Sequence, residues 1–215
     1  HVDMSSLTLE QLAQTVITYL AVERVLYEFV GNGREHNIFC VPILDTPSVR
    51  KLAIICQSGS ELFENSALTG EEFRYSGLNF AALRKFGTLE FRQLHGTGDK
   101  DLVFQWVNIL LSVRKFAISH KSFKTLVERI LALNTNSEYI QFLVDVFGPE
   151  FSGIRDVVGD VANKLYDGVA AVKFSMCSGI IHKAIQTNRS AESAANKWLA
   201  ANGWVKEGYS IADYI

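Results

Sequence analysis

The residues with the clearest chemical potential lie in residues 87–99, which read GTLEFRQLHGTGD. Side chains alternate between the two sides of an extended strand, so Glu90 and Arg92 are expected to point the same way, about 7 Å apart. A carboxylate and a guanidinium on one face of a buried strand either pair with each other or hold a ligand between them. A metal-bound phosphate would suit both groups, because carboxylates bind divalent cations and guanidinium groups bind phosphate oxygens.

The same segment carries a family resemblance. The run TLEFRQLHGTGD, followed by DLVFQWVNILLSVRKFA, resembles the amidoligase family, which belongs to the carboxylate–amine ligase superfamily of glutamate–cysteine ligase and glutamine synthetase. Three further segments fit in the expected order: HVD at residues 1–3, GREHN at residues 33–37 and RYSGLN at residues 74–79. The resemblance covers about the first 120 residues.

The resemblance implies a fold and a reaction. The fold would be α+β, with helices packed on one face of an antiparallel sheet, as in the catalytic domain of glutamine synthetase without its first strands. The activity would be an ATP- and Mg²⁺-dependent ligation that joins a carboxylate of an amino acid or peptide to an amine. The carboxylate must first be phosphorylated, because direct ligation is uphill, and phosphoryl transfer depends mainly on positioning and charge neutralisation.

The central pair has two interpretations. By resemblance, Glu90 would bind the metal, and Arg92 would bind the nucleotide phosphate and act in catalysis. An ordinary ion pair on an exposed strand face explains the same two residues. Spacing alone favours the ion pair, whereas the resemblance favours the catalytic interpretation.

The loop GTGD after the strand also has two interpretations. Glycines let backbone N–H groups approach an anion at the start of a helix, so the loop could bind phosphate or substrate. In that case Thr97 would act in catalysis and Asp99 would contact substrate. Alternatively, the loop is a tight turn in which Asp99 caps the following helix. The Thr97 hydroxyl has no evident structural role in the sequence.

Four other polar residues complete the candidate site by resemblance. His1 and Arg34 would bind the nucleotide, and Arg74 and Asn79 would hold the substrate. The plainer alternatives are a terminal histidine, a solvated loop arginine and a surface arginine. Asn79 lies in an apolar stretch and therefore needs hydrogen-bond partners.

The elements that would position these residues are mostly helical. Thr8 and Gln11 form a capping box, and an apolar stripe follows it with helical spacing as far as residue 30. A strand is expected over residues 73–80. Further helices are expected over residues 101–119, 121–133, 137–147, 154–166, 169–186 and 193–202, with Asp167 and Gly168 as a stop. Residues 1–119 are interpreted as the catalytic part and residues 120–215 as a helical extension.

Composition limits the partners. The 21 lysines and arginines nearly balance the 23 aspartates and glutamates, which argues against a nucleic-acid binder. No apolar run has the length of a membrane span. Three widely spaced cysteines (Cys40, Cys56 and Cys177) suggest buried thiols in a reducing compartment. Together with the resemblance, which implies a bacterial or phage source, this leads us to expect the cytoplasm of a bacterial or phage-infected cell.

A second hypothesis belongs to another class. The sequence begins at His1, directly on an apparent internal motif, and the resembled family carries an earlier strand with paired glutamates that is not in this sequence. The chain could be an inactive structural or assembly protein that retains the ligase fold, for example in a phage virion.

For the ligase, the expected substrate is an amino acid or peptide. The chain could also form a homo-oligomer or lack an N-terminal segment of the full protein.

Overall fold

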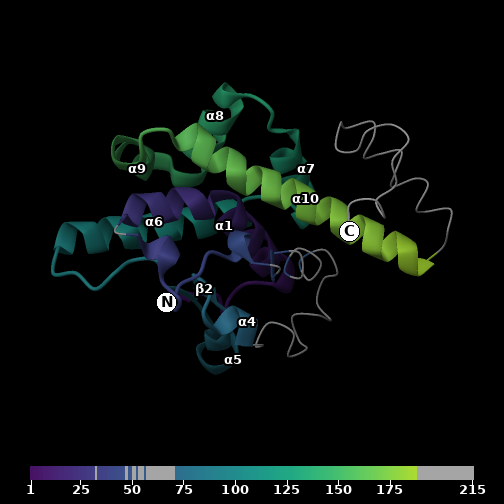
Figure 1. Ribbon diagram of the computed structural model, residues 1–215, viewed down its shortest axis with the longest axis horizontal. Helices are drawn as coiled ribbons and strands as arrows, with labels where there is room; N and C mark the ends of the chain where they lie inside the picture. Colours follow the sequence, from purple (N-terminus) through teal and green to yellow (C-terminus); the bar gives the residue numbers. More distant parts are fainter. Residues whose placement is uncertain (32, 47, 50–51, 53–55, 57–70, 188–215) are drawn as a thin grey trace.

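The fold is α+β and mainly helical. A computed structural model of the chain describes residues 1–31, 33–46, 48, 49, 52, 56 and 71–187. Helices make up most of this part, and three short strands form one antiparallel sheet (Figure 1). These elements agree with the predicted α+β class, while the helix expected over residues 193–202 lies outside the described residues.

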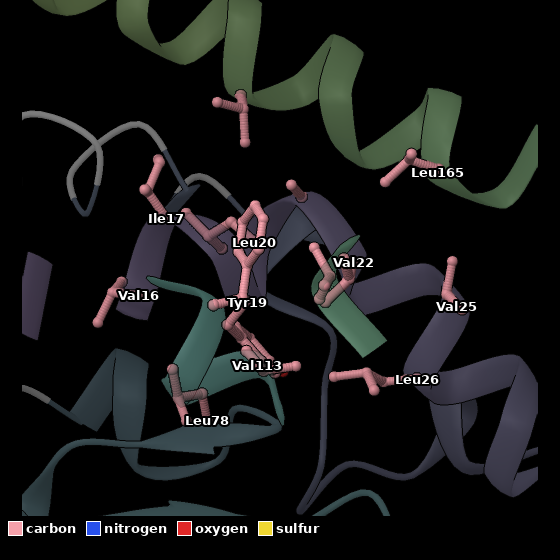
Figure 2. Close-up of a cluster of buried hydrophobic side chains, with 14 of the residues drawn as sticks. Val16, Ile17, Tyr19, Leu20, Val22, Val25, Leu26, Leu78, Val113 and Leu165 are labelled. Carbon is pink, nitrogen blue, oxygen red and sulfur yellow. The ribbon is translucent and has the colours of Figure 1, made fainter. Parts of the chain in front are cut away.

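Helix α1 (Leu9–Val30) is the centre of the molecule. Its predicted capping box is present, because Gln11 N donates to the Thr8 hydroxyl at 3.2 Å and Thr8 N donates to Gln11 Oε1 at 3.0 Å. Nearly every residue after the first turn is buried, not only one stripe. Figure 2 shows the reason: α1 lies between α10, which carries Leu165, and a second layer that contributes Leu78 and Val113.

The sheet has β3 in its centre. Strand β3 (Thr88–Phe91) pairs antiparallel with β1 (Val2–Asp3) on one side and with β2 (Leu78–Asn79) on the other. The register places Asn79 directly opposite Glu90. The strand predicted in the 87–99 segment is thus confirmed.

The strand predicted over residues 73–80 is mostly wrong. Its first part is a helical turn, α4 (Glu71–Arg74), and only β2 is extended. The Ser76 hydroxyl donates to the carbonyls of Phe73 and Leu78, which stabilises a turn before β2. Gly77 then approaches the hydroxyl of Tyr27 so closely that a Cβ at this position would lie 2.2 Å from it. This long-range contact does not appear in local sequence periodicity.

The other elements in the described part of the chain are 3₁₀ turns and α-helices. In chain order they are η1 (Arg34–His36), η2 (Ile43–Asp45), α5 (Ala81–Phe86), α6 (Lys100–Ile118), α7 (Phe123–Ala132), α8 (Asn136–Phe147), η4 (Gly148–Glu150), α9 (Phe151–Val158) and α10 (Val161–Thr187). The helices predicted over residues 101–119, 121–133 and 137–147 are confirmed as α6, α7 and α8. Each begins after a side-chain cap, which is Asp99, Ser122 or Thr135.

The stop predicted at Gly168 is wrong. The chain breaks earlier, at Gly159, whose φ of +72° favours glycine, and α10 then continues through Gly168. Gly168 is needed because α10 crosses α1 at very close range. A Cβ there would lie 2.1 Å from the carbonyl oxygen of Ala21. Helix–helix packing therefore explains this glycine, not helix termination.

The second half of the chain shares the core of the first. Helices α6, α7, α9 and α10 all contact α1, and one cluster of buried hydrophobic residues includes members from both halves. Cys40 and Cys56 are free and buried, as expected. The division at residue 119 stays a prediction.

None of the helices in the described part of the chain is, by itself, long and apolar enough to cross a membrane. The bent pair α6 and α7, at 108° to each other, passes this test only when the two are taken together.

Candidate functional site

Glu90 and Arg92 lie on the same side of β3, as the alternation predicts. Arg92 Nε is 3.1 Å from Glu90 Oε1, and Arg92 Nη2 donates to Glu90 Oε2 at 3.2 Å. The two side chains are 26% and 27% exposed, so the pair is reached by solvent but is not fully surrounded by it. The structure therefore shows a two-point ion pair, the arrangement that spacing alone favours.

Asn79 completes this cluster from the neighbouring strand. Its Nδ2 donates to Glu90 Oε2 at 2.6 Å, and its Oδ1 accepts from Ala81 N at 3.0 Å. The buried amide is satisfied at both ends, as its apolar surroundings require. Partial burial raises the pKa of Glu90, but the hydrogen bonds from Arg92 and Asn79, with the charge of Arg92, outweigh it. The pKa of Glu90 consequently lies below its ordinary value, and the carboxylate is ionised at neutral pH.

An open cavity of about 580 Å³ adjoins this cluster. Its lining residues come from the 34–39 loop, the α4–β2 turn and β3 with its C-terminal extension: Arg34, Phe39, Arg74, Tyr75, Glu90, Phe91, Arg92 and Leu94. Three guanidinium groups and one carboxylate give this lining a formal charge of +2. The cavity is therefore suited to an anion.

The three arginines are not equally available. Arg34 donates from Nε to the carbonyl of Gln93 and from Nη2 to the carbonyl of Arg92, both at 2.8 Å, so it mainly holds the chain after β3 in place. Arg92 uses three of its five N–H donors, two for Glu90 and one for the carbonyl of Arg74. Two donors of Arg92 have no partner among the residues that the structure describes.

Arg74 is the least committed cation of the cavity. Its guanidinium carbon lies 5.6 Å from the centroid of the Tyr75 ring. Among the residues that the structure describes, no hydrogen bond or ion pair ties the Arg74 guanidinium down. Within the described residues, Arg74 contacts the Tyr75 ring, whereas Arg34 is tied to two backbone carbonyls.

Three predicted site residues lie elsewhere. His1 Nδ1 is hydrogen-bonded to Thr88 Oγ1 at 2.9 Å, beyond the other edge of β3. Asp99 Oδ1 accepts from the first backbone N–H groups of α6, at 3.0 and 3.1 Å, so it is a helix cap. The Thr97 hydroxyl accepts from Asp99 N at 3.1 Å. A turn and a cap account for this loop, and neither Thr97 nor Asp99 lines the cavity.

Sequence reasoning missed a buried carboxylate beneath the site. Glu23 on α1 is fully buried and accepts from Tyr19 Oη at 2.7 Å and from Ile43 N and Leu44 N at 2.9 Å each. Burial raises the pKa of Glu23 to about 7, although these hydrogen bonds oppose the shift. Gln93 Nε2 in turn donates to the Tyr19 hydroxyl, which connects the network to the cavity wall. The sequence around Glu23 gives no signal, because a polar residue in a long helix normally faces water.

The sequence also did not reveal the two aromatic residues at the rim of the cavity. Phe39 and Tyr75 are 60% and 41% exposed, and their ring centroids are 5.7 Å apart. Tyr75 directly follows Arg74, which was the available signal for it, whereas Phe39 lies five positions after Arg34. Aromatic rings beside guanidinium groups are typical of sites that bind flat anionic ligands.

The described residues do not provide a divalent-cation site. They contain no group of three or more histidine, cysteine, aspartate or glutamate side chains that could hold a metal ion. Glu90 Oε2 already accepts hydrogen bonds from Asn79 and Arg92, and Glu90 Oε1 is 3.1 Å from Arg92 Nε in the ion pair. A Mg²⁺ ion prefers several oxygen ligands at short range, and one engaged carboxylate does not meet that need. The guanidinium groups of Arg74 and Arg92 are of the kind that binds phosphate oxygens.

Comparison with known proteins gave no relative from which to transfer a function. No protein-family model, no curated protein and no solved structure matches this chain. The function is therefore inferred from the geometry of the cavity.

Proposed function

We propose that the cavity beside β3 binds the anionic groups of an ATP-dependent carboxylate–amine ligase reaction, in which an amide bond forms through an acyl phosphate. The observation that carries the proposal is the position of Glu90 and Arg92: they lie together on one side of β3 in a cavity that two more arginines line. The three strands would then form part of a glutamine-synthetase-like sheet, in a protein of the cytoplasm.

Each residue has a distinct role in this proposal. Arg74 and the two spare donors of Arg92 would bind the phosphoryl group and neutralise its charge as it passes to the substrate carboxylate. Glu90 holds the Arg92 guanidinium at two points, and Arg34 fixes the backbone that carries Arg92. Asn79 orients Glu90. No step is assigned to Mg²⁺, since the described residues lack a site for it.

One observation favours the second hypothesis, an inactive structural or assembly protein. Glu90 and Arg92 satisfy each other, and the described residues offer no cation site. A protein that has kept the fold and lost the chemistry would show these features. The two hypotheses differ in turnover, because the ligase must release ADP in the presence of its amino-acid or peptide substrate, whereas the structural protein must not.

The first test is a set of arginine variants titrated with ATP by calorimetry. Arg74→Ala and Arg92→Ala should each weaken binding by roughly 10- to 100-fold, because each removes charged hydrogen bonds worth about 1.5–3 kcal/mol. Arg155→Ala is the matched control, since Arg155 is an exposed arginine of α9 outside the cavity. Equal affinities in all four proteins would refute the proposed anion site. ADP release with a panel of amino acids then separates the ligase from the inactive protein.

A further inference from the structure

Two aromatic rings border the cavity beside its least committed arginine. Phe39 and Tyr75 are both large, both well exposed and 5.7 Å apart between ring centroids, with the ring planes tilted by 59°. The Arg74 guanidinium lies on the Tyr75 ring. Exposed aromatic residues that converge from distant parts of the chain are a common feature of binding sites.

Hydrogen bonds join the two backbone segments that carry the rings. Val41 N donates to the carbonyl of Tyr75 and Gly77 N donates to the carbonyl of Val41, both at 2.9 Å, so the two loops are joined directly behind the rings. Asn37 Oδ1 accepts from Phe39 N at 2.8 Å, which fixes the turn that presents Phe39. The aromatic rim, defined as Phe39 and Tyr75, is therefore formed before any ligand arrives, which lowers the entropic cost of binding.

The charge of the cavity limits the ligand class. Its lining carries a formal charge of +2, and Glu90 is already neutralised by Arg92. A ring with a single carboxylate would leave positive charge uncompensated. A ring with phosphates would place several anionic oxygens within reach of Arg74 and of the spare donors of Arg92, while the ring stacks on the rim.

We propose that this site binds a mononucleotide, with its base on the aromatic rim and its phosphates on Arg74 and Arg92, without a divalent cation. The inference rests on the proposed function, because it concerns the same cavity. It goes further by assigning Phe39 and Tyr75 as base-binding residues and by making nucleotide binding independent of metal. The guanidinium groups take the place that a cation would otherwise occupy near the phosphates.

The test compares three ligands on the full chain by calorimetry in EDTA: ATP, inorganic tripolyphosphate and adenosine. ATP should bind at least tenfold more tightly than tripolyphosphate, because only ATP can also stack on the rim. Tyr75→Leu should weaken ATP binding roughly tenfold and leave tripolyphosphate binding unchanged. Phe104→Leu is the control, since Phe104 is a 69% exposed aromatic residue of α6 that does not line the cavity. Phe39→Leu provides a second test if Tyr75→Leu does not fold.

The possible failures are distinguishable. If tripolyphosphate binds as well as ATP and neither rim variant changes this, the base-binding inference is overturned while the anion site stands. If ATP binds only when Mg²⁺ is added, the metal-free part is overturned. If adenosine binds as tightly as ATP, the assignment of the phosphates to Arg74 and Arg92 is overturned. If no ligand binds with or without Mg²⁺, the proposed function fails with the inference.

Discussion

Gly168→Ala should lower the free energy of unfolding by about 3 kcal/mol, since overpacking costs of this size arise when a buried contact has no room for an added carbon. The new Cβ would lie 2.1 Å from the Ala21 carbonyl oxygen and 3.0 Å from that of Leu20. Both are backbone atoms of α1, so α10 must move away from the central helix. Urea unfolding measures the change, and the melting temperature should fall by roughly 5–10 °C.

Gly153→Ala is the matched control for this prediction. Gly153 is also helical, and its added Cβ would lie 2.3 Å from an atom, but that atom is the Nε2 of Gln105 at the end of a flexible side chain. Gln105 can turn aside, and alanine favours a helix over glycine by about 1 kcal/mol, so this variant should be neutral or slightly more stable. Equal stability of Gly168→Ala and the unaltered chain would show that α10 does not pack on α1 as closely as described. It would also favour residues 120–215 as a separable extension.

Glu23→Ala should destabilise the chain by about 3–5 kcal/mol. The substitution leaves the N–H groups of Ile43 and Leu44 and the hydroxyl of Tyr19 without their buried acceptor. Because Tyr19 also accepts from Gln93, beside Arg92, the cavity wall should loosen too. The expected measurements are a lower urea midpoint and weaker ATP binding. A stability change below about 1 kcal/mol would contradict this role for Glu23.

Glu23 should also make stability depend on pH. Burial raises its pKa to about 7, above the value of 4.5 for an unperturbed glutamate, so the folded chain binds more protons than the unfolded chain between these values. The part of the stability that depends on the protonation of Glu23 is therefore fully present below about pH 4.5, falls as the pH rises, and is lost above about pH 7. The total change is of the order of 3 kcal/mol.

Glu23→Gln isolates this effect. The amide cannot ionise, so the free energy of unfolding of this variant should fall less than that of the unaltered chain between pH 5 and pH 8. Glu128→Gln is the control, because Glu128 is exposed and forms only a 3.7 Å surface pair with Lys124. Parallel pH profiles for Glu23→Gln and the unaltered chain would mean that the hydrogen bonds to Glu23 cancel the effect of burial on its pKa.

The sequence alone determined what depends on neighbours along the chain. Helical periodicity predicted α6, α7 and α8 within a few residues, because an apolar stripe needs only regular spacing. The capping box of Thr8 and Gln11 likewise marked the start of α1, because a helix start needs an acceptor for its first N–H groups. The alternation of a strand likewise placed Glu90 and Arg92 on one side of β3. Each of these inferences uses contacts between residues only a few positions apart.

Only the tertiary structure decided the rest. From the sequence, Gly168 suggests a helix stop, whereas its close contact with α1 is the reason for this glycine. Glu23 looks like a surface residue in the sequence, whereas the backbone of residues 43–44 covers it in the fold. The aromatic rim joins residues 36 positions apart in the sequence, Phe39 and Tyr75, through a backbone bridge near Val41. Such contacts depend on how distant segments pack, and local propensity carries no information about them. The charged residues of the cavity were therefore candidates from the sequence, whereas its aromatic rim came only from the tertiary structure.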